Sequence, residues 1–239
     1  MLHSPSKVFT GYRVNWTLLI LPSSNTQTIF NIHIFKRMKK APNRVVARYS
    51  KALTSYGSHS AKALRWHSYA SAAKRYVELV KDLDIKDHTI LDVGCGFGDI
   101  IPYLLSKHSN FTYTGIDIMP EFIEVAQQRY EGFNFIKGDF WDKSFVQKFD
   151  YIICCGTLNG KEWTLSDREK MIKKLFNQAE VGIAFCMIGH FPKPKTKIKK
   201  GKIGHIDALK MLKYCLSLTS KVIFRQHYHH DDFTIVLLK

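Results

Sequence analysis

The chain has 239 residues, 45% of them hydrophobic, so it can bury one sizeable core. Ordinary glycine and proline contents (14 and 7 residues) exclude fibrous and low-complexity proteins, and no apolar run is long enough to predict a membrane span. The net charge of +16 is uneven: no acidic residue precedes Glu78, and Lys193–Lys202 forms a lysine-rich segment. The rest of the chain is nearly neutral, which is not typical of a nucleic-acid-binding surface.

The cysteines indicate a reducing environment. There are five of them, and each lies in or beside an apolar run: Cys95, Cys154, Cys155, Cys186 and Cys215. An odd number of such residues predicts buried thiols in a cytoplasmic protein rather than a disulfide framework. No Cys/His spacing indicates zinc, so no metal is expected.

The first forty residues allow three interpretations. The apolar run Val14–Leu21 resembles the core of a signal peptide, but no cleavage site of small residues follows it. An acid-free stretch that contains arginine also fits a transit peptide. These two possibilities are both targeting segments. A second interpretation is translation from Met38, which would leave the preceding residues without a structural role, and a third is a genuine extension of the domain. We expect residues 1–40 to be an unstructured, targeting or wrongly assigned extension, and residues 41–239 to form one domain.

Beyond residue 44, short apolar runs alternate with helical patterns. The expected strands are Thr89–Val93, Thr112–Asp117, Phe133–Lys137, Tyr151–Cys155, Val181–Ile188, Lys221–His227 and Phe233–Leu238. The expected helices are Ser68–Leu83, Asp99–Lys107, one that begins at Pro120, one that begins with a capping box at Ser166–Glu169, and one marked by apolar residues from Ile206 to Leu216. Such alternation predicts the α/β class, with a parallel sheet covered on both faces.

A glycine-rich loop directly follows the first of these strands. Asp92 precedes three glycines, Gly94, Gly96 and Gly98. A strand, a glycine loop and a helix bind an adenosine-containing cofactor, because glycine lets the backbone approach the ligand and the helix offers free amides. The dinucleotide fingerprint needs two residues between its last two glycines, and only Phe97 stands here. The carboxylate of Asp92 would repel a pyrophosphate and suits a cationic amino-acid group instead.

Two more carboxylates follow at the ends of later strands. Asp117 ends the second strand, nineteen residues after Gly98, where an acid can accept hydrogen bonds from both hydroxyls of a ribose. Asp139 and Phe140 follow the third strand and offer a carboxylate for an adenine amino group and an aromatic ring beside the base.

The segments LDVGCGFGD, TGIDIMP and KGDFWD resemble, in order and spacing, the first three motifs of the class I S-adenosylmethionine (SAM)-dependent methyltransferases. The resemblance runs from about residue 45 to 239 and is closest to a poorly characterised bacterial branch with small-molecule acceptors. It implies a Rossmann-like three-layer sandwich of seven mostly parallel strands, the last antiparallel. It also implies a helical cap over residues 41–87, a core over residues 88–239, and S-adenosyl-L-methionine as the cofactor.

The resemblance assigns roles to single residues. The methionine part of the cofactor would lie against Asp92, Gly94, Cys95, Gly96 and Gly98, the ribose and adenine against Asp117, Ile118, Asp139 and Phe140, and the sulfonium beside Cys155 and Gly156. In the cap, Tyr49, Trp66 and Arg75 are candidates to close over the cofactor's carboxylate, with a plain packing role open for each.

Chemistry at such a site needs few catalytic groups. A sulfonium already activates its methyl group, so the protein must mainly align the acceptor and exclude water. A base is needed only when the acceptor arrives protonated. Candidates at strand ends are His190, His227 and Asn159, with a surface or structural role as the alternative for the histidines. We interpret Tyr228–Asp231 as a solvated turn rather than a metal site.

The sequence does not specify the acceptor. The Asn-Pro-Pro-Tyr type of motif expected for amino methylation of adenine or glutamine is absent, and no proline adjoins Cys154 and Cys155 as a cytosine-C5 nucleophile requires. The Lys193–Lys202 loop fits a solvated loop or an anionic partner. We expect a small-molecule acceptor and no membrane partner. An RNA methyltransferase, a non-catalytic cofactor-binding module and, least favoured, an NAD-dependent enzyme remain as alternatives.

Overall fold

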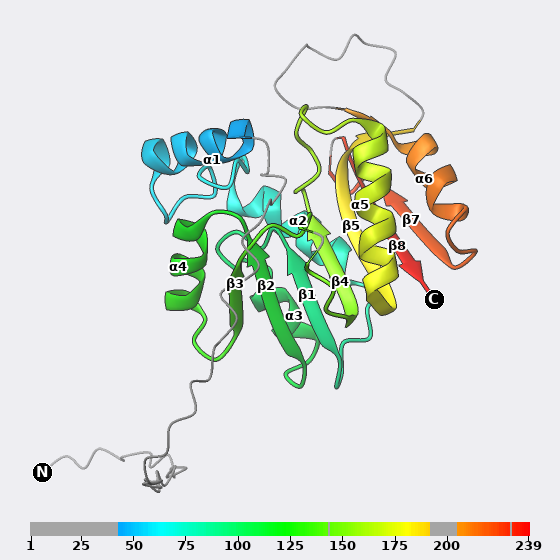
Figure 1. Cartoon of the computed structure of the whole chain (residues 1–239), viewed down its shortest axis with the longest axis horizontal. Coiled ribbons are helices and arrows are strands. Elements are labelled where there is room, and N and C mark those ends of the chain that lie inside the picture. The colour runs from blue at the N-terminus through cyan, green and yellow to red at the C-terminus, as the bar shows by residue number, and fades with distance from the viewer. Residues whose placement is uncertain (1–42, 143, 192–204, 230) are drawn as a thin grey trace, which may run out of the picture. The chain divides into compact units, whose positions relative to one another are not determined.

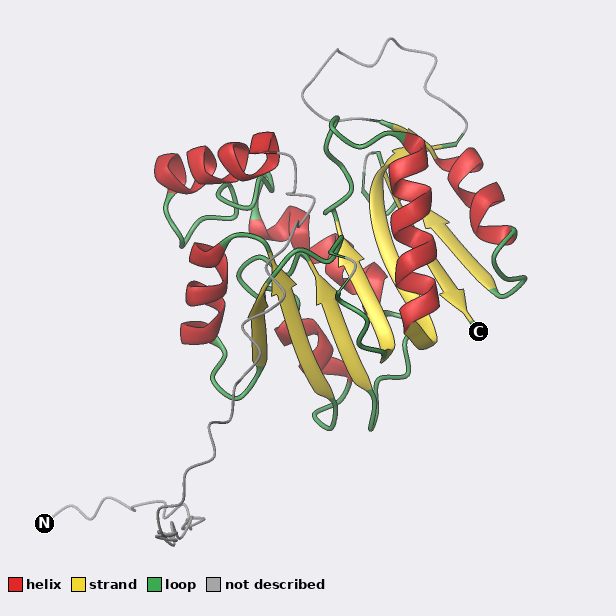
Figure 2. Ribbon diagram, viewed as in Figure 1, coloured by secondary structure: helices red, strands yellow, loops and turns green. Residues whose placement is uncertain are grey.

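A central sheet with helices on both faces organises the molecule (Figures 1 and 2). The structure is a computed structural model, and it describes residues 43–142, 144–191, 205–229 and 231–239. The predictions for residues 1–40, for the Lys193–Lys202 loop and for the side chain of His190 concern parts of the chain outside the described residues.

Seven strands follow one another in the order β3-β2-β1-β4-β5-β8-β7, and a short eighth strand, β6, pairs with the end of β5. Their bounds are β1 Thr89–Val93, β2 Thr112–Asp117, β3 Asn134–Lys137, β4 Phe149–Cys155, β5 Ala179–His190, β6 Ile206–Asp207, β7 Val222–Gln226 and β8 Asp232–Leu238. Only β8 runs antiparallel to its neighbours, β5 and β7. The predicted class and sheet are therefore confirmed.

Six helices are described: α1 Asn43–Tyr56, α2 Tyr69–Val80, α3 Ile101–Lys107, α4 Pro120–Arg129, α5 Leu165–Gln178 and α6 Ala208–Leu216. Successive strand side chains point to opposite faces of the sheet. Ile90 and Ile153 accordingly pack with α2, α3 and α4, whereas Leu91 and Ile152 pack with α5 and α6. This alternation makes two apolar cores, one on each side of the sheet.

Two local predictions need correction. The capping box of α5 begins at Thr164 rather than Ser166, because Thr164 has the extended backbone of an N-cap and exchanges hydrogen bonds with Asp167 (3.1 and 3.0 Å). Ile206 lies in β6 instead of α6, and Asp207 caps that helix through the backbone N–H of Lys210. The spacing of apolar residues did not reveal where α6 begins, because Ile206, a buried residue of β6, stands at a position that fits the helical spacing.

The two helices predicted as a cap have different positions. α2 packs against β4, β5, β8 and α3, so it is part of a helical layer on the sheet. α1 instead packs through Tyr49 and Leu53 against a separate small apolar cluster that includes Phe97 and Phe122. α1 and the turn that follows it therefore cover the carboxyl ends of the strands (Figure 1).

Candidate active site

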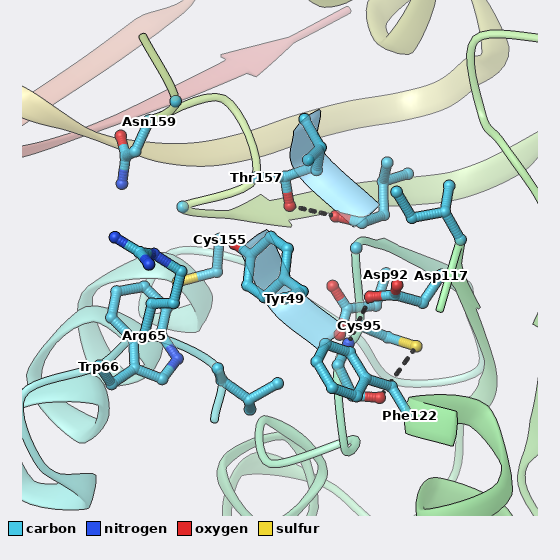
Figure 3. A pocket seen from close by; sticks show the side chains of 18 of the residues that line it. Tyr49, Arg65, Trp66, Asp92, Cys95, Asp117, Phe122, Cys155, Thr157 and Asn159 are labelled. Carbon is cyan, nitrogen blue, oxygen red and sulfur yellow. Dashed lines mark hydrogen bonds between the residues drawn. The ribbon is translucent and has the colours of Figure 1, made fainter. Parts of the chain in front are cut away.

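A cavity of 310 Å³ lies at the carboxyl ends of β1, β2 and β4. Two features place it there: the strand order reverses between β1 and β4, and loops diverge at such a point in an open α/β sheet. All but one of the predicted cofactor residues line it: Tyr49, Arg75, Asp92, Gly94, Cys95, Gly96, Asp117, Ile118, Asp139, Phe140, Cys155 and Gly156. Figure 3 shows the cavity with several of these side chains directed into it.

The glycine loop forms the floor of the cavity. Gly94 has a φ of +76°, and a Cβ atom there would overlap the side chain of Thr157. The hydroxyl of Thr157 is itself held by the carbonyl oxygen of Val93, to which it donates at 2.9 Å. Gly96 also has a positive φ, and its Cβ would meet Leu64 at 2.8 Å. Glycine is required here both for backbone conformation and for space.

Asp117 is fixed at the end of β2. One oxygen accepts from the backbone N–H of Gly96 (3.0 Å) and the other from that of Met119 (2.9 Å). Burial raises the pKa of Asp117 to about 6, although these backbone hydrogen bonds oppose the shift. The carboxylate thus links the glycine loop to β2 and presents an acceptor group to the cavity.

Asp92 lies deeper, at the end of β1. Burial raises its pKa to about 7, and the hydrogen bond that it accepts from the phenol of Tyr113 (2.9 Å) opposes the shift. The charge of Asp117 acts in the same direction as burial. A cation in the cavity would stabilise the ionised form of both carboxyl groups.

The third acid is followed by two aromatic residues. Asp139 accepts a hydrogen bond from the backbone N–H of Trp141 (2.9 Å), and Phe140 is buried against Phe145. Trp141 stacks on Trp163 with ring centroids 5.5 Å apart, and both rings line the cavity. The indole N–H of Trp141 is buried without a hydrogen-bond partner among the described residues, so a ligand acceptor atom could bind it.

The end of β4 carries a close contact with the cap. Gly156 has a positive φ, and the ring of Trp66 lies where its Cβ would be (2.6 Å). Cys155 is half-buried, and its sulfur lies 3.1 Å from that of Cys186 on the neighbouring strand. Burial raises the pKa of the Cys155 thiol, which disfavours it as a nucleophile.

An ion pair fastens α1 over the cavity. The guanidinium of Arg48 donates two hydrogen bonds to the carboxylate of Glu162 (2.9 and 2.5 Å), in the loop after β4. Tyr49, the next residue, contacts Phe122 edge to face (5.8 Å between centroids) and points into the cavity (Figure 3). Arg65, in the turn after α1, also lines the cavity and has a positive φ of 63°, which is uncommon for a residue with a Cβ.

Several predicted residues have other positions. Gly98 does not line the cavity: it turns the chain, and its Cβ would meet Tyr130 at 3.0 Å. His227 is exposed in the turn after β7 and contacts Gln226. Asn159 lines the cavity, but its side-chain oxygen already accepts from the backbone N–H of Ile188 (2.8 Å), so it serves to position the loop.

Sequence reasoning missed His229. The Tyr228–Asp231 turn is not simply solvated, because His229 lines the cavity with 21% of its side chain exposed and contacts Ser71 and Arg75 of α2. Arg75 is engaged by Asp232 at 2.6 Å and stacks on Trp66. No sequence signal joins the start of α2 to the β7–β8 turn. Within the described residues, no group of three or more His, Cys, Asp or Glu side chains is placed to hold a metal ion.

Comparison with known proteins matches this geometry. Residues 90–195 match the family model described as a methyltransferase domain, and they contain the glycine loop and all three carboxylates. This part of the chain is thus similar to methyltransferase domains. The match ends before β7 and β8, so the turn with His229 lies outside the part of the domain that the family model covers.

Relatives of this methyltransferase domain act on different acceptors, as their names state. The chain is 32% identical to a malonyl-[acyl-carrier protein] O-methyltransferase of Acetivibrio thermocellus, over 59% of this chain and 50% of the relative. It is 35% identical to a demethylmenaquinone methyltransferase of Thermotoga maritima, over 54% of each chain. The matched part thus spans about half the length of these two relatives.

The fold of the methyltransferase domain also occurs among solved structures. One is magnesium protoporphyrin IX methyltransferase from Synechocystis PCC 6803 with bound SAM, which is 16% identical, with a TM-score of 0.53, over 72% of this chain and 79% of that one. At this identity the likeness concerns the fold. None of the helices in the described parts of the chain is long and apolar enough to cross a bilayer.

Proposed function

We propose that the protein transfers the methyl group of S-adenosylmethionine to a small-molecule acceptor in the cavity at the carboxyl ends of β1, β2 and β4. One observation carries the proposal: three carboxylates on successive strand ends line one 310 Å³ cavity together with the glycine loop. A volume of about 300 Å³ is at the lower end of the range for small-molecule sites.

The carboxylates would bind successive parts of the cofactor. Asp92 would pair with the α-ammonium group, Asp117 would accept from the ribose hydroxyls, and Asp139 would accept from the adenine amino group. Ile118 and Phe140 line the same cavity and offer apolar surface for the base. Gly94, Cys95 and Gly96 would leave room for the methionine part, and Cys155 and Gly156 would lie beside the sulfonium.

The chemistry needs alignment more than it needs side-chain groups. When bound, SAM supplies a methyl group on a positively charged sulfur, which a nucleophile can displace directly. The chain must hold the acceptor in line with that methyl group and exclude water. Tyr49, Trp66 and α1, tied down by the Arg48–Glu162 pair, would close the cavity above the cofactor.

The first experiment is calorimetric titration of the purified protein with SAM, its demethylated product S-adenosylhomocysteine (SAH), and NAD. We expect micromolar binding of SAM and SAH and none of NAD. Asp117→Ala should weaken SAH binding by about 1.5–3 kcal/mol, as for the loss of hydrogen bonds to a charged group. The matched control is Asp142→Ala, because Asp142 is a partly exposed acid that does not line the cavity.

The outcomes separate the functional classes. A folded protein that binds neither SAM nor SAH would contradict the proposal. Binding with no turnover on any acceptor would favour a non-catalytic cofactor-binding module. Turnover on RNA with affinity that falls steeply with salt would favour the RNA methyltransferase alternative.

A further inference from the structure

The segment between α1 and α2 crosses the cavity from the glycine loop to the end of β4. Leu64 lies 2.8 Å from the position that a Cβ atom of Gly96 would take. Trp66 lies 2.6 Å from the corresponding position at Gly156. Arg65 stands between Leu64 and Trp66 and lines the same cavity. Close contacts with a glycine on each side thus hold Arg65 at the wall of the cavity.

Arg65 carries a positive charge that no acid among the described residues neutralises. Its side chain forms no hydrogen bond or ion pair within the described parts of the chain. The other two described arginines that line the cavity are both paired, Arg48 with Glu162 and Arg75 with Asp232. Arg65 also has a φ of 63°, which glycine adopts at lower cost. An unpaired cation on strained backbone at a cavity wall indicates a ligand with a negative charge.

A second donor faces the cavity from the loop after β4. The side-chain oxygen of Asn159 accepts a hydrogen bond from the backbone N–H of Ile188 (2.8 Å), so the other end of its amide is the nitrogen Nδ2, which can only donate. Nδ2 lies 3.3 Å from the Cβ position of Gly156 and has no hydrogen-bond partner among the described residues. Figure 3 shows this nitrogen and the guanidinium of Arg65 directed toward the same part of the cavity, away from Asp117.

We propose that Arg65 and Asn159 bind a carboxylate group of the methyl acceptor, which is therefore a small carboxylic acid. This proposal rests on the proposed function and deepens it. A guanidinium and a side-chain amide present N–H donors in flat groups, which suit the two oxygens of a carboxylate. The opposite charges of the guanidinium and the carboxylate strengthen these hydrogen bonds.

The position of the two donors assigns them to the acceptor rather than to the cofactor's own carboxylate. Nδ2 of Asn159 adjoins Gly156, and Arg65 is next in sequence to Trp66, whose ring contacts the same glycine. Under the proposed function, the sulfonium lies beside Gly156 and the methionine part lies along the glycine loop after β1. The two donors are therefore nearer to the reacting methyl group than to the end of the methionine part.

The distribution of acids in the cavity supports an anionic acceptor. The acids that line it lie at the ends of β1 and β2 or just after β3: Asp92, Asp117 and Asp139. None of the described lining residues at the end of β4 is an acid. Bound SAM would add the positive charge of its sulfonium to that of Arg65 at this end. An anionic group is attracted there, and a cationic acceptor is repelled.

The first test asks whether the SAH-loaded protein prefers a carboxylate, with benzoate, benzamide and phenyl phosphate as the probes. The full chain is labelled with ¹⁵N-asparagine, and the side-chain amide signals of Asn159 are assigned by their loss in Asn159→Asp. We expect benzoate to shift these signals saturably, benzamide to bind at least about tenfold more weakly, and phenyl phosphate to bind no more tightly than benzoate. Equal binding of benzamide, tighter binding of phenyl phosphate, or no saturable shift with benzoate would overturn the proposal.

The role of Arg65 is tested through Arg65→Gly. This change removes the guanidinium and suits the positive φ of the position, so the variant should fold, as a thermal melt would check. We expect benzoate to bind at least about tenfold more weakly, because hydrogen bonds between charged groups are lost. Lys62→Gln is the matched control, since Lys62 is an exposed cation of the same segment that does not line the cavity. An unchanged benzoate affinity in Arg65→Gly would overturn the proposal.

Calorimetry separates this proposal from the proposed function. Arg65→Gly should bind SAH as the parent protein does, and also 5′-methylthioadenosine, which lacks the amino-acid part of SAH. A loss of affinity for SAH but not for 5′-methylthioadenosine would overturn the proposal, because Arg65 would then bind the cofactor's carboxylate. The benzoate titration is repeated without SAH. A parent protein that binds benzoate at Asn159 but does not bind SAH would contradict the cofactor site and leave only the carboxylate site.

The role of Asn159 is tested through Asn159→Asp. This change keeps an oxygen for the backbone N–H of Ile188 but replaces the donor Nδ2 by a second oxygen. Saturation transfer from the protein to benzoate should fall to the level seen with benzamide, because the two carboxylates repel each other, and SAH should bind as before. Benzoate binding that equals that of the parent protein would overturn the role of Asn159. If this variant does not fold, Arg65→Gly decides.

Discussion

The two sides of the cavity are built in different ways. On one side, Asp92 and Asp117 lie at the ends of β1 and β2, and Asp139 closely follows β3; these three strands are neighbouring and parallel. On the other side, Ser71 and His229 are 158 residues apart in the chain and meet only through the packing of α2 beside β8. The first side can be recognised from short sequence segments, because each acid comes at or just after the end of a strand. The second side cannot, because its residues are far apart in the chain.

This difference explains why one half of the site was predictable. Parallel strands bring their carboxyl ends to one edge of a sheet, so an acid at each strand end is placed by secondary structure alone. A helix and a hairpin turn meet at positions that depend on the whole packing of the domain. We therefore expect substitutions on the first side to change cofactor affinity.

The largest effect on affinity is expected from Gly94→Ala. Its Cβ would overlap Thr157 in a backbone conformation with positive φ, so the loop must move out of its place under the cofactor. We expect SAH affinity to fall by at least about tenfold, consistent with roughly 1–3 kcal/mol of strain. Gly132→Ala is the control, because Gly132 also has a positive φ (90°) but open space around it. Equal affinity losses in both variants would contradict the role given to the loop.

The next effect is a pH dependence confined to the cofactor side. Burial raises the pKa of Asp92 to about 7 and that of Asp117 to about 6. Both groups should bind SAM as carboxylates, so affinity should rise with pH and level off above about pH 7–8, changing by about tenfold per unit for each group that is protonated. Calorimetry across this range checks it, and Asp92→Asn should remove the upper part of the slope.

In the absence of cofactor, the stability of the protein should depend on pH in the opposite direction to the affinity for SAM. Both folded-state pKa values lie above those of the unfolded chain, so the folded state binds more protons in the range between them. The free energy of unfolding of the ligand-free protein should therefore fall as the pH rises from about 4 to about 7, and saturating SAM should reduce that fall. A melting temperature that rises across this range without ligand would contradict the assignment.

The smallest effect is expected at the clamp over the cavity. Arg48→Met should increase the dissociation rate of SAH a few-fold, because the partly exposed pair with Glu162 contributes only about 0.5–1 kcal/mol. Glu162→Gln should have the same effect, and the double variant should add little to either. Lys148→Met, which breaks an exposed pair with Glu180 away from the cavity, is the matched control. Stopped-flow measurement of SAH release would test this prediction. Equal release rates in all these variants would show that the Arg48–Glu162 pair does not hold the cavity closed.

The sequence predicted most of the fold but not every boundary. β1 and β2 have the predicted bounds, because apolar runs of five or six residues between turn signals leave little choice. The predicted cap of α5 was two residues too late. Thr164 and Ser166 each lie three residues before an acid, and only the backbone conformation shows that Thr164 is the cap. Among the site residues, Arg75 lines the cavity, but its guanidinium pairs with Asp232, a partner that no motif indicates.

By itself, the sequence determined the alternation of strands and helices and the carboxylates at the strand ends, because both depend on residues close together in the chain. It also indicated that glycine must follow β1, since only glycine adopts those backbone angles at low cost. Only the tertiary structure decided that α1 rather than α2 covers the cavity and that His229 rather than His227 faces it. Those outcomes depend on side-chain packing between segments that are distant along the chain.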